Sequence, residues 1–163
     1  MSRYFRHPVT LVSFVLCLLC ALTLVALPQL SVRAQEQQTE MKDEPRFHDY
    51  KGVRIGMSAD EARQKLGTPQ DKSDQQDFYA VSDKETVQVS YDAQHNVAAL
   101  AVMYLDADKA PAPKAVLGAE LTANPDGRIY RLVRYPKVGY WVSYSRTAGD
   151  SPLVTVMMQK YKP

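Results

Sequence analysis

The side chains that could carry acid-base or metal chemistry are few and scattered. His48 and Asp49 are adjacent in a polar stretch, and His95 lies in a predicted hairpin turn. Neither histidine has a second ligand at the spacing typical of a metal site. We therefore expect both histidines to be exposed to solvent.

Three acids, Asp71, Asp74 and Asp77, follow one another at a spacing of three residues. A calcium loop would also need a glycine at its sharp turn and a distal glutamate, and this stretch has neither. The sequence therefore predicts a solvated polar loop over residues 70–77 and no metal site.

Nucleophilic chemistry has little support. The only cysteines, Cys17 and Cys20, lie in an apolar N-terminal stretch, so the chain after residue 20 has no disulfide, thiol nucleophile or cysteine metal site. No serine sits in a glycine-flanked elbow, and no phosphate-binding glycine loop occurs. We predict a protein that is not an enzyme and needs no cofactor.

An aromatic and basic cluster in the C-terminal half is the clearest candidate site. On a strand, Tyr140 and Tyr144 share one face and Trp141 lies on the other, so Trp141 points outward if the tyrosines are core. Tyrosine, tryptophan and arginine are the residues that most often dominate binding energy at interfaces. The candidate partner-binding residues are Arg128, Arg131, Arg134, Tyr140, Trp141 and Tyr144.

Two interpretations of this cluster stay open. An exposed tryptophan beside arginines suits an acidic partner protein, an anionic lipid headgroup or a glycan. Alternatively, the aromatic residues form the core of the second half and the arginines are solvated. Nucleic acid is not favoured for an exported, nearly neutral chain.

A short helix is fully specified by its ends. Ser58 and Glu61 have the spacing of a capping box. Gly67 can end the helix by adopting a left-handed conformation, and Pro69 prevents the helix from continuing. The structural capping residues are therefore Ser58, Glu61 and Gly67. The narrow apolar stripe of this helix predicts packing against a sheet.

Strand-like patterns follow the helix. They cover residues 78–81, 86–91 and 97–105, and then 128–135, 140–145 and 153–159. The stretch 97–105 is apolar on both faces, which predicts a central strand covered by the helix on one side and by another layer on the other. The fold class is therefore α+β, with a short helix or helices packed on an antiparallel sheet.

A family resemblance rests on several short signals in a fixed order. Ile55-Gly56-Met57-Ser58, Leu66-Gly67-Thr68-Pro69, Phe78-Tyr79-Ala80-Val81, and Val87 to Asp92 followed by Val97 together resemble the SmpA/OmlA domain of the outer-membrane assembly lipoprotein BamE. The same helix-then-strands unit is similar to the β-lactamase-inhibitor-protein-like folds. The resemblance covers about residues 50–105 and implies a partner-binding module without shared chemistry.

The C-terminal half repeats parts of this order. Val116-Leu117-Gly118 follows Lys65-Leu66-Gly67 by 51 residues, and Val142-Ser143-Tyr144 follows Val89-Ser90-Tyr91 by 53. We interpret residues 47–105 and 106–163 as a degenerate tandem repeat. Chance similarity between two hairpins of one antiparallel sheet is the alternative.

The N-terminus has the pattern of an export signal. Residues 1–34 combine basic residues, an apolar stretch and a Val32-Arg33-Ala34 ending, which favours a cleaved signal peptide over an uncleaved anchor. A leucine precedes each cysteine, whereas lipid attachment requires a small residue there, so a lipid anchor is disfavoured. Residues 35–46 are polar and predict a flexible tether.

Charge divides the exported part. Residues 35–105 carry 8 Lys+Arg against 13 Asp+Glu, whereas residues 106–163 carry 9 against 5. Such a division can steer a charged partner or help the two halves dock on each other. The simpler explanation is that both halves have solvated surfaces whose charges differ by chance.

Two functions fit these observations. The first is a periplasmic or cell-envelope interaction module similar to the BamE domain, which docks on an envelope protein through a sheet face or a strand edge. The alternative is a secreted inhibitor or ligand-binding module of the β-lactamase-inhibitor-like type. Membrane association through the N-terminal segment is open in the first case, and neither fixes an oligomeric state.

Overall fold

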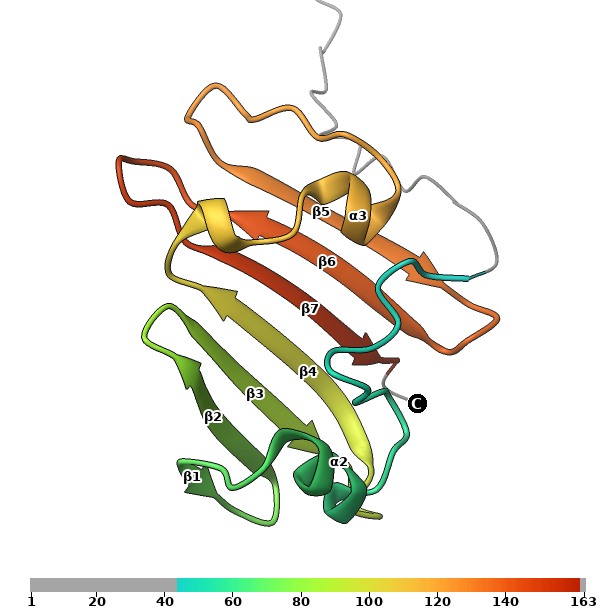
Figure 1. Cartoon of the computed structure of the whole chain (residues 1–163). Coiled ribbons are helices and arrows are strands. Elements are labelled where there is room, and N and C mark those ends of the chain that lie inside the picture. Colours follow the sequence, from blue (N-terminus) through green and yellow to red (C-terminus); the bar gives the residue numbers. More distant parts are fainter. Residues whose placement is uncertain (1–43, 162–163) are drawn as a thin grey trace, which may run out of the picture. The chain divides into compact units, whose positions relative to one another are not determined.

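Seven antiparallel strands form one sheet in the computed structural model, which describes residues 44–161 (Figure 1). Six of them match the predicted strands to within two residues at each end, and the α+β class is confirmed. The seventh, β1, falls in the predicted loop 70–77 and is too short to show the alternation of apolar and polar residues that marks a strand. The strands are β1 (Asp71–Lys72), β2 (Gln76–Ser82), β3 (Glu85–Tyr91), β4 (Val97–Tyr104), β5 (Ile129–Tyr135), β6 (Tyr140–Arg146) and β7 (Val154–Lys160).

Helix α2 (Ala59–Leu66) begins with the predicted capping box. The Ser58 Oγ accepts a hydrogen bond from the Glu61 N–H at 3.3 Å, and the Glu61 Oε2 accepts one from the Ser58 N–H at 3.2 Å. Gly67 ends the helix with a φ of 86° and a ψ of −156°. This is outside the left-handed helical region that we expected, but it is a conformation essentially restricted to glycine.

The strand order is β1-β2-β3-β4-β7-β6-β5. One helix and three long strands follow each other twice. Helix α2 precedes β2, β3 and β4, with the two-residue β1 between α2 and β2, and α3 (Pro113–Leu117) precedes β5, β6 and β7. A short 3-10 helix, η1 (Ala107–Lys109), lies between the two halves in the sequence. The halves join where β4 pairs with β7, so both contribute to one sheet.

This junction corrects one prediction. We expected a second layer over the far side of β4, and the second half was a candidate for it. Instead, the second half extends the sheet edgewise through β7. The two-sided apolar pattern of β4 reflects a central position between β3 and β7, with Ala99 and Ala101 on the side away from the helices.

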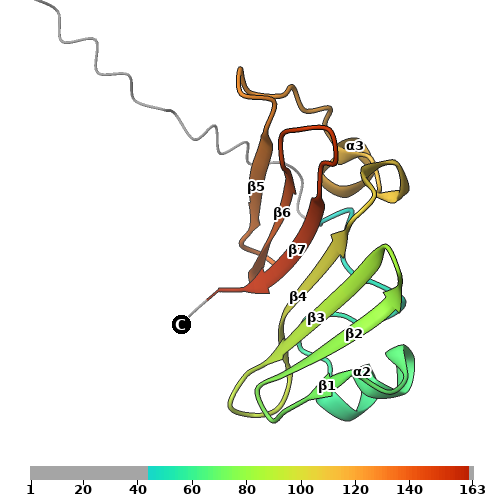
Figure 2. The ribbon, with the colours of Figure 1, turned by 90° about the vertical axis from the view of Figure 1, so that its left-hand side faces the viewer.

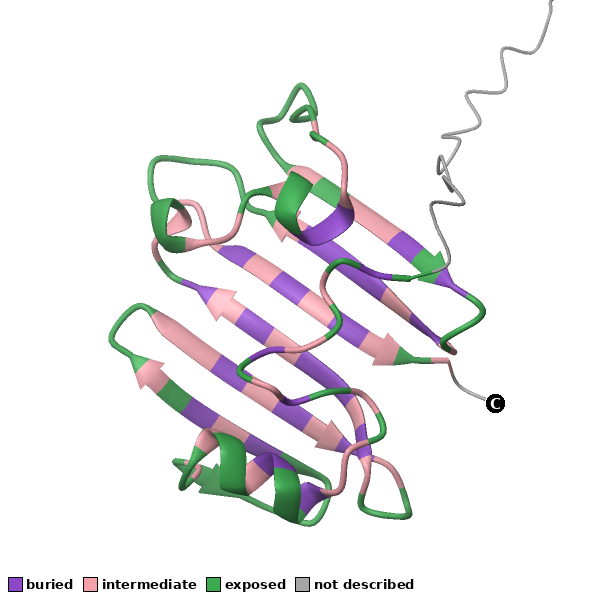
Figure 3. Ribbon diagram, turned by 45° about the vertical axis from the view of Figure 1, so that its right-hand side comes forward, coloured by how far each residue is buried: buried purple, intermediate pink, exposed green. Residues whose placement is uncertain are grey.

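Helices α2 and α3 lie on the same side of the sheet, which we call the covered face (Figure 2). Strands β3 and β7 alternate between buried and more exposed residues (Figure 3). The buried set forms one hydrophobic core shared by both halves, and its fully buried members include Val87, Val89, Leu100, Val102, Val142, Val156 and Met158.

The segment of residues 44–57, here the pre-helix segment, crosses the covered face before α2 (Figures 1 and 3). Tyr50 and Val53 are buried and bond to each other through both backbone pairs, at 3.0 and 2.9 Å. Lys51 and Gly52 turn the chain between them with positive φ angles. The segment then pairs with the start of β4, where the Gly56 N–H donates to the Val97 carbonyl.

The structure describes the last residues of the predicted tether, 44–46, where Pro45 is buried and Glu44 and Arg46 are exposed. The predicted signal segment 1–34 and residues 35–43 lie outside the described residues. Between residues 44 and 161, no helix is long and apolar enough to cross a membrane.

Candidate functional site

Strand β6 separates the predicted aromatic residues by alternation. Tyr140 and Tyr144 are buried on the covered face, with 8% and 4% of their surface exposed. Trp141 is half-buried and lies on the opposite side, as we expected if the tyrosines belong to the core. The two tyrosines are therefore not part of any surface that a partner could contact together with Trp141.

The three predicted arginines also lie in different places. Arg134 pairs in register with Trp141, so both side chains lie on the same side of the sheet. Arg131 pairs with Tyr144 and faces the helices. Arg128 precedes β5 and binds the Asp126 carboxylate at 2.6 Å. Of the six candidate residues, the structure brings only Arg134 and Trp141 together on the side away from the helices.

That side, here called the uncovered face because none of the described helices lies on it (Figure 2), is continuous across six strands. The registers align its residues in three rows, one of which runs from Phe78 through Gln88, Ala101, Met157 and Ser143 to Leu132. The helices and the pre-helix segment lie on the other side of the sheet (Figure 2). The face comprises Gln76, Phe78, Ala80, Thr86, Gln88, Ser90, Ala99, Ala101, Met103, Thr155, Met157, Gln159, Trp141, Ser143, Ser145, Tyr130, Leu132 and Arg134.

The composition of the uncovered face is unlike that of an ordinary solvated sheet face. Arg134 is its only charged residue, although 23% of the chain is charged. Its larger side chains are aromatic residues and methionines: Phe78, Tyr130, Trp141, Met103 and Met157. Protein interfaces are depleted in Lys, Asp, Glu, Ser and Ala and enriched in aromatic residues, Met and Arg. The face follows this signal in its lack of Lys, Asp and Glu and in its aromatic residues and methionines, but not in its three serines and three alanines.

A buried ionic cluster anchors α2 to the sheet. Asp77 on β2 is fully buried, and its Oδ2 accepts hydrogen bonds from Arg63 Nε at 2.8 Å and from the Tyr91 hydroxyl at 2.7 Å. Tyr79 donates a third hydrogen bond at 3.3 Å. This overturns our expectation that Asp77 belongs to a solvated loop. The signal was available: Asp77 precedes buried Tyr79 by two residues and so shares its side of the strand.

The electrostatics of this cluster indicate a structural role. Burial alone would raise the pKa of Asp77, but hydrogen bonds from Arg63 and Tyr91 hold it below its ordinary value. Burial and the Asp77 charge raise the pKa of Tyr79 to about 12. The carboxyl group therefore stays ionised and the phenol stays neutral near pH 7, so neither group is prepared for proton transfer.

The remaining titratable candidates do not converge. His48 is exposed and contacts Asp49 at 3.2 Å, and exposed His95 occupies a turn with a φ of 57°. Asp71 and Asp74 are exposed, whereas Asp77 is buried against Arg63. Within the part of the chain that the structure describes, no group of three or more His, Cys, Asp or Glu residues could hold a metal ion.

The uncovered face was not predicted as a unit. The sequence pointed to Trp141 and Arg134 within it, because both stand out by residue type. It did not point to Phe78, Met103 or Met157, since only the strand order places them on the same face as Trp141. Comparison of the chain with family models, with curated proteins and with solved structures gives no match.

Proposed function

We propose that this chain is a non-enzymatic, exported interaction module of the cell envelope that docks on a partner protein through the uncovered face. The observation that carries this proposal is the composition of that face, which has one charge among eighteen side chains. A sheet face meant only for solvent commonly carries polar and charged residues in alternation with the core. The near absence of charged residues from this face favours contact with another protein.

The size of the uncovered face supports the proposal. Six strands about 4.8 Å apart and about 20 Å long present a planar area on the order of 500 Å². A standard interface buries roughly 800 Å² on each partner, and side-chain relief adds to the planar value. The face therefore provides most of one standard interface.

The export part of the proposal rests on the N-terminal sequence. Residues 1–34 have the basic, apolar and small-residue regions of a signal peptide, and the polar tether follows. Resemblance to the SmpA/OmlA domain supports an envelope partner, such as a component of outer-membrane assembly. The repeated order of one helix and three strands supports a degenerate tandem repeat related to the BamE and β-lactamase-inhibitor architectures.

A second candidate function is that of a secreted inhibitor or ligand-binding module. The observation in its favour is the continuous sheet, because β4–β7 pairing joins the faces of both halves into one surface. Such a surface can occlude the site of a single partner. Retention at the envelope favours the first function, and release as a soluble, tightly binding monomer favours the second.

Site-specific photo-crosslinking in native envelopes tests the docking face. A photo-reactive residue replaces Gln88 on the uncovered face or, as a matched control, exposed Gln64 on α2. We expect one envelope protein to crosslink from position 88 and not from position 64. Trp141→Ala should reduce that crosslink at least tenfold, because a half-buried tryptophan contributes a large contact area.

The same experiment can refute the proposal. Equal crosslinking from positions 88 and 64, or a crosslink from position 88 that Trp141→Ala leaves unchanged, would show that the uncovered face is not the docking surface. Circular dichroism of each variant establishes that the sheet is intact. Fractionation of the crosslinked product separates the envelope module from the released inhibitor.

A further inference from the structure

Methionine is the only sulfur-bearing residue in the part of the chain that the structure describes. After residue 20 the sequence has no cysteine, and the described part contains Met57, Met103, Met157 and Met158. A methionine thioether is readily oxidised to a sulfoxide. These four side chains are therefore the sulfur sites at which a peroxide can act on the fold.

The four methionines differ in burial. Met158 is fully buried in the core. Met57 is half-buried before α2 and packs against the core. Met103 on β4 and Met157 on β7 are half-buried on the uncovered face. Alternation along β7 thus gives Met157 contact with solvent and places its chain neighbour Met158 inside the core.

Met103 and Met157 lie close to each other near the middle of the uncovered face. The register pairs Met103 with Thr155, two residues before Met157, and pairs Trp141 with Gln159, two residues after Met157. Such diagonal positions on one face of an antiparallel pair are about 7–8 Å apart, within reach of long side chains. The two thioethers and the tryptophan therefore form one diagonal line across β4, β7 and β6.

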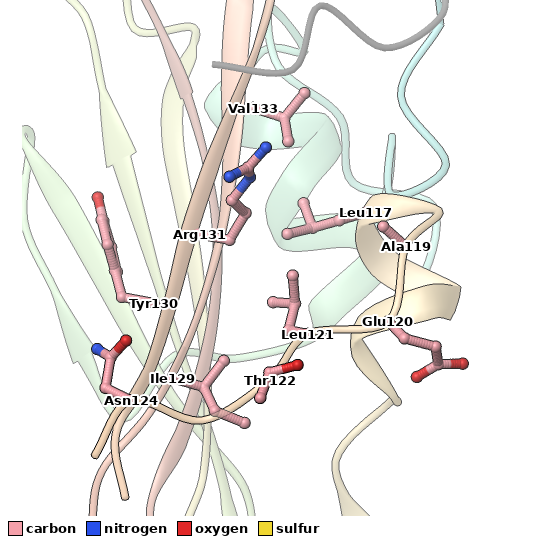
Figure 4. Close-up of a pocket in the computed structure, with 10 residues that line it drawn as sticks. All are labelled: Leu117, Ala119, Glu120, Leu121, Thr122, Asn124, Ile129, Tyr130, Arg131 and Val133. Atoms are coloured by element: carbon pink, nitrogen blue, oxygen red, sulfur yellow. The ribbon is translucent and has the colours of Figure 1, made fainter. Parts of the chain in front are cut away.

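Dissolved oxidant reaches this diagonal from the uncovered face. A separate cavity of about 500 Å³ borders β5 (Figure 4). Leu117 and Leu121 line it on one side and Ile129 and Val133 line it from the strand, and none of its lining residues is a methionine. The cavity therefore offers no route to either sulfur, and oxidation depends on direct contact with solvent.

Oxidation changes the chemistry of the diagonal. The sulfur gains an oxygen, so a flexible apolar side chain becomes a polar one. A partner that covers the face would have to desolvate two sulfoxide groups beside Trp141, which costs free energy unless each group finds a hydrogen-bond donor. A docking surface that fits the thioethers is therefore weakened by their oxidation.

We propose that Met103 and Met157 are a paired oxidation site and that their conversion to sulfoxides weakens docking through the uncovered face. The oxidant is a peroxide. The sulfur lone pair attacks one peroxide oxygen, the sulfur–oxygen bond forms as the oxygen–oxygen bond breaks, and hydrogen peroxide leaves as water while the sulfur loses two electrons. The effect on docking rests on the proposed function, whereas the oxidation itself does not.

Peptide mass spectrometry of the full-length chain, treated with hydrogen peroxide in mild detergent, tests the site. We expect Met103 and Met157 to gain one oxygen at least tenfold faster than Met158 while the protein is folded. In concentrated urea the three rates should become equal, because burial no longer protects Met158. Equal rates in the folded protein would overturn the assignment of the site.

Photo-crosslinking from position 88 tests the effect on docking. The chain is oxidised, freed of peroxide and then added to native envelopes, so that the partner is not oxidised. We expect the crosslink to fall at least fivefold. The double variant Met103→Leu and Met157→Leu keeps apolar side chains of similar volume without sulfur, so its crosslink should survive the treatment. Met57→Leu is the matched control and should lose the crosslink as the wild type does.

Three results would overturn the effect on docking. These are a crosslink that oxidation leaves unchanged, an equal loss in the double leucine variant, or loss of the sheet on oxidation, measured by circular dichroism. Absence of any crosslink from position 88 before oxidation would refute the docking function and the effect on it together. Selective oxidation is measured on the free chain, so the modification site and the docking function fail separately.

Discussion

At the scale of single residues, Asp77 stands out as the only charged residue among the buried residues that the structure describes. Its carboxylate is fully buried and accepts hydrogen bonds from Arg63, Tyr79 and Tyr91. Arg63 comes from α2, whereas the two tyrosines come from β2 and β3. One acidic side chain therefore connects the helix to two strands.

Asp77→Ala should destabilise the fold by about 3 kcal/mol, the lower end of the range for breaking a buried ion pair. The lower end applies because Arg63 keeps 22% of its side chain exposed and can be hydrated in part. Urea unfolding monitored by circular dichroism measures the change. Asp74→Ala, an exposed control from the same segment, should change stability by less than about 0.5 kcal/mol. Equal effects of both substitutions would contradict the structural role.

The same cluster predicts acid sensitivity. The pKa of Asp77 is lowered in the folded state, so its stabilisation is complete above the unfolded-state pKa of about 3.9. That stabilisation is lost as the pH falls from there through the folded pKa. Urea midpoints between pH 7 and pH 2 should therefore decline more steeply below about pH 4 in the wild type than in Asp77→Asn. Parallel curves would show that Asp77 is not the titrating group.

At the scale of elements, α2 depends on its first turn and on the sheet below it. The helix has eight residues, which is too short to be stable alone. Its stability comes from the capping box, from buried Ala59 and Ala62, and from the link between Arg63 and Asp77.

Ser58→Ala should cost about 1 kcal/mol, because the Glu61 N–H loses its side-chain acceptor at the start of the helix. Thermal unfolding measures the loss. Ser58→Asp should retain most of the wild-type stability, since aspartate also accepts this hydrogen bond and suits the positive end of a helix. A similar loss in both variants would indicate that capping is not the source of the effect.

The pre-helix segment is an element that sequence patterns conceal. Tyr50 is buried, and its hydroxyl donates to Glu85 on β3 at 2.8 Å. Val53 is fully buried in the shared core. The segment thus covers part of the sheet that neither helix reaches, although it contains no helix and only isolated bridges. A segment without periodicity gives no sequence signal of this kind.

At the scale of the whole molecule, the two halves should unfold together. They share one sheet through β4 and β7 and one hydrophobic core. The only tryptophan, Trp141, lies in the second half and reports on that half by fluorescence.

Asp77 lies in the first half. Asp77→Ala should shift the unfolding midpoint measured by Trp141 fluorescence by the same amount as the midpoint measured by circular dichroism. The two shifts should agree because, in cooperative two-state unfolding, neither half stays folded alone. Denaturant titration of both signals on one sample makes the comparison. A Trp141 transition that stays at its wild-type midpoint would show that the halves are separate folding units.

Local features of the fold could be predicted because they depend on neighbouring residues. The cap of α2 requires only Ser58 and Glu61, and the six long strands follow from alternation within seven or eight residues. Alternation along β6 separates Trp141 from Tyr140 and Tyr144, as the sequence indicated, whereas a binding role of these residues stays a prediction. The burial of Asp77 was missed, because its partner Arg63 is fourteen residues away.

The sequence by itself indicated helix α2, the six long strands and, on the condition that Tyr140 and Tyr144 are core, the position of Trp141 on the opposite side of its strand. These are properties of short-range geometry and of hydrophobic alternation. Only the tertiary structure decided that β7 pairs with β4, that six strands present one nearly uncharged face, and that β5 is the last described strand at one edge of the sheet. The strand order could not be predicted from the sequence because pairing between distant segments depends on the packing of the whole core, which no local pattern encodes.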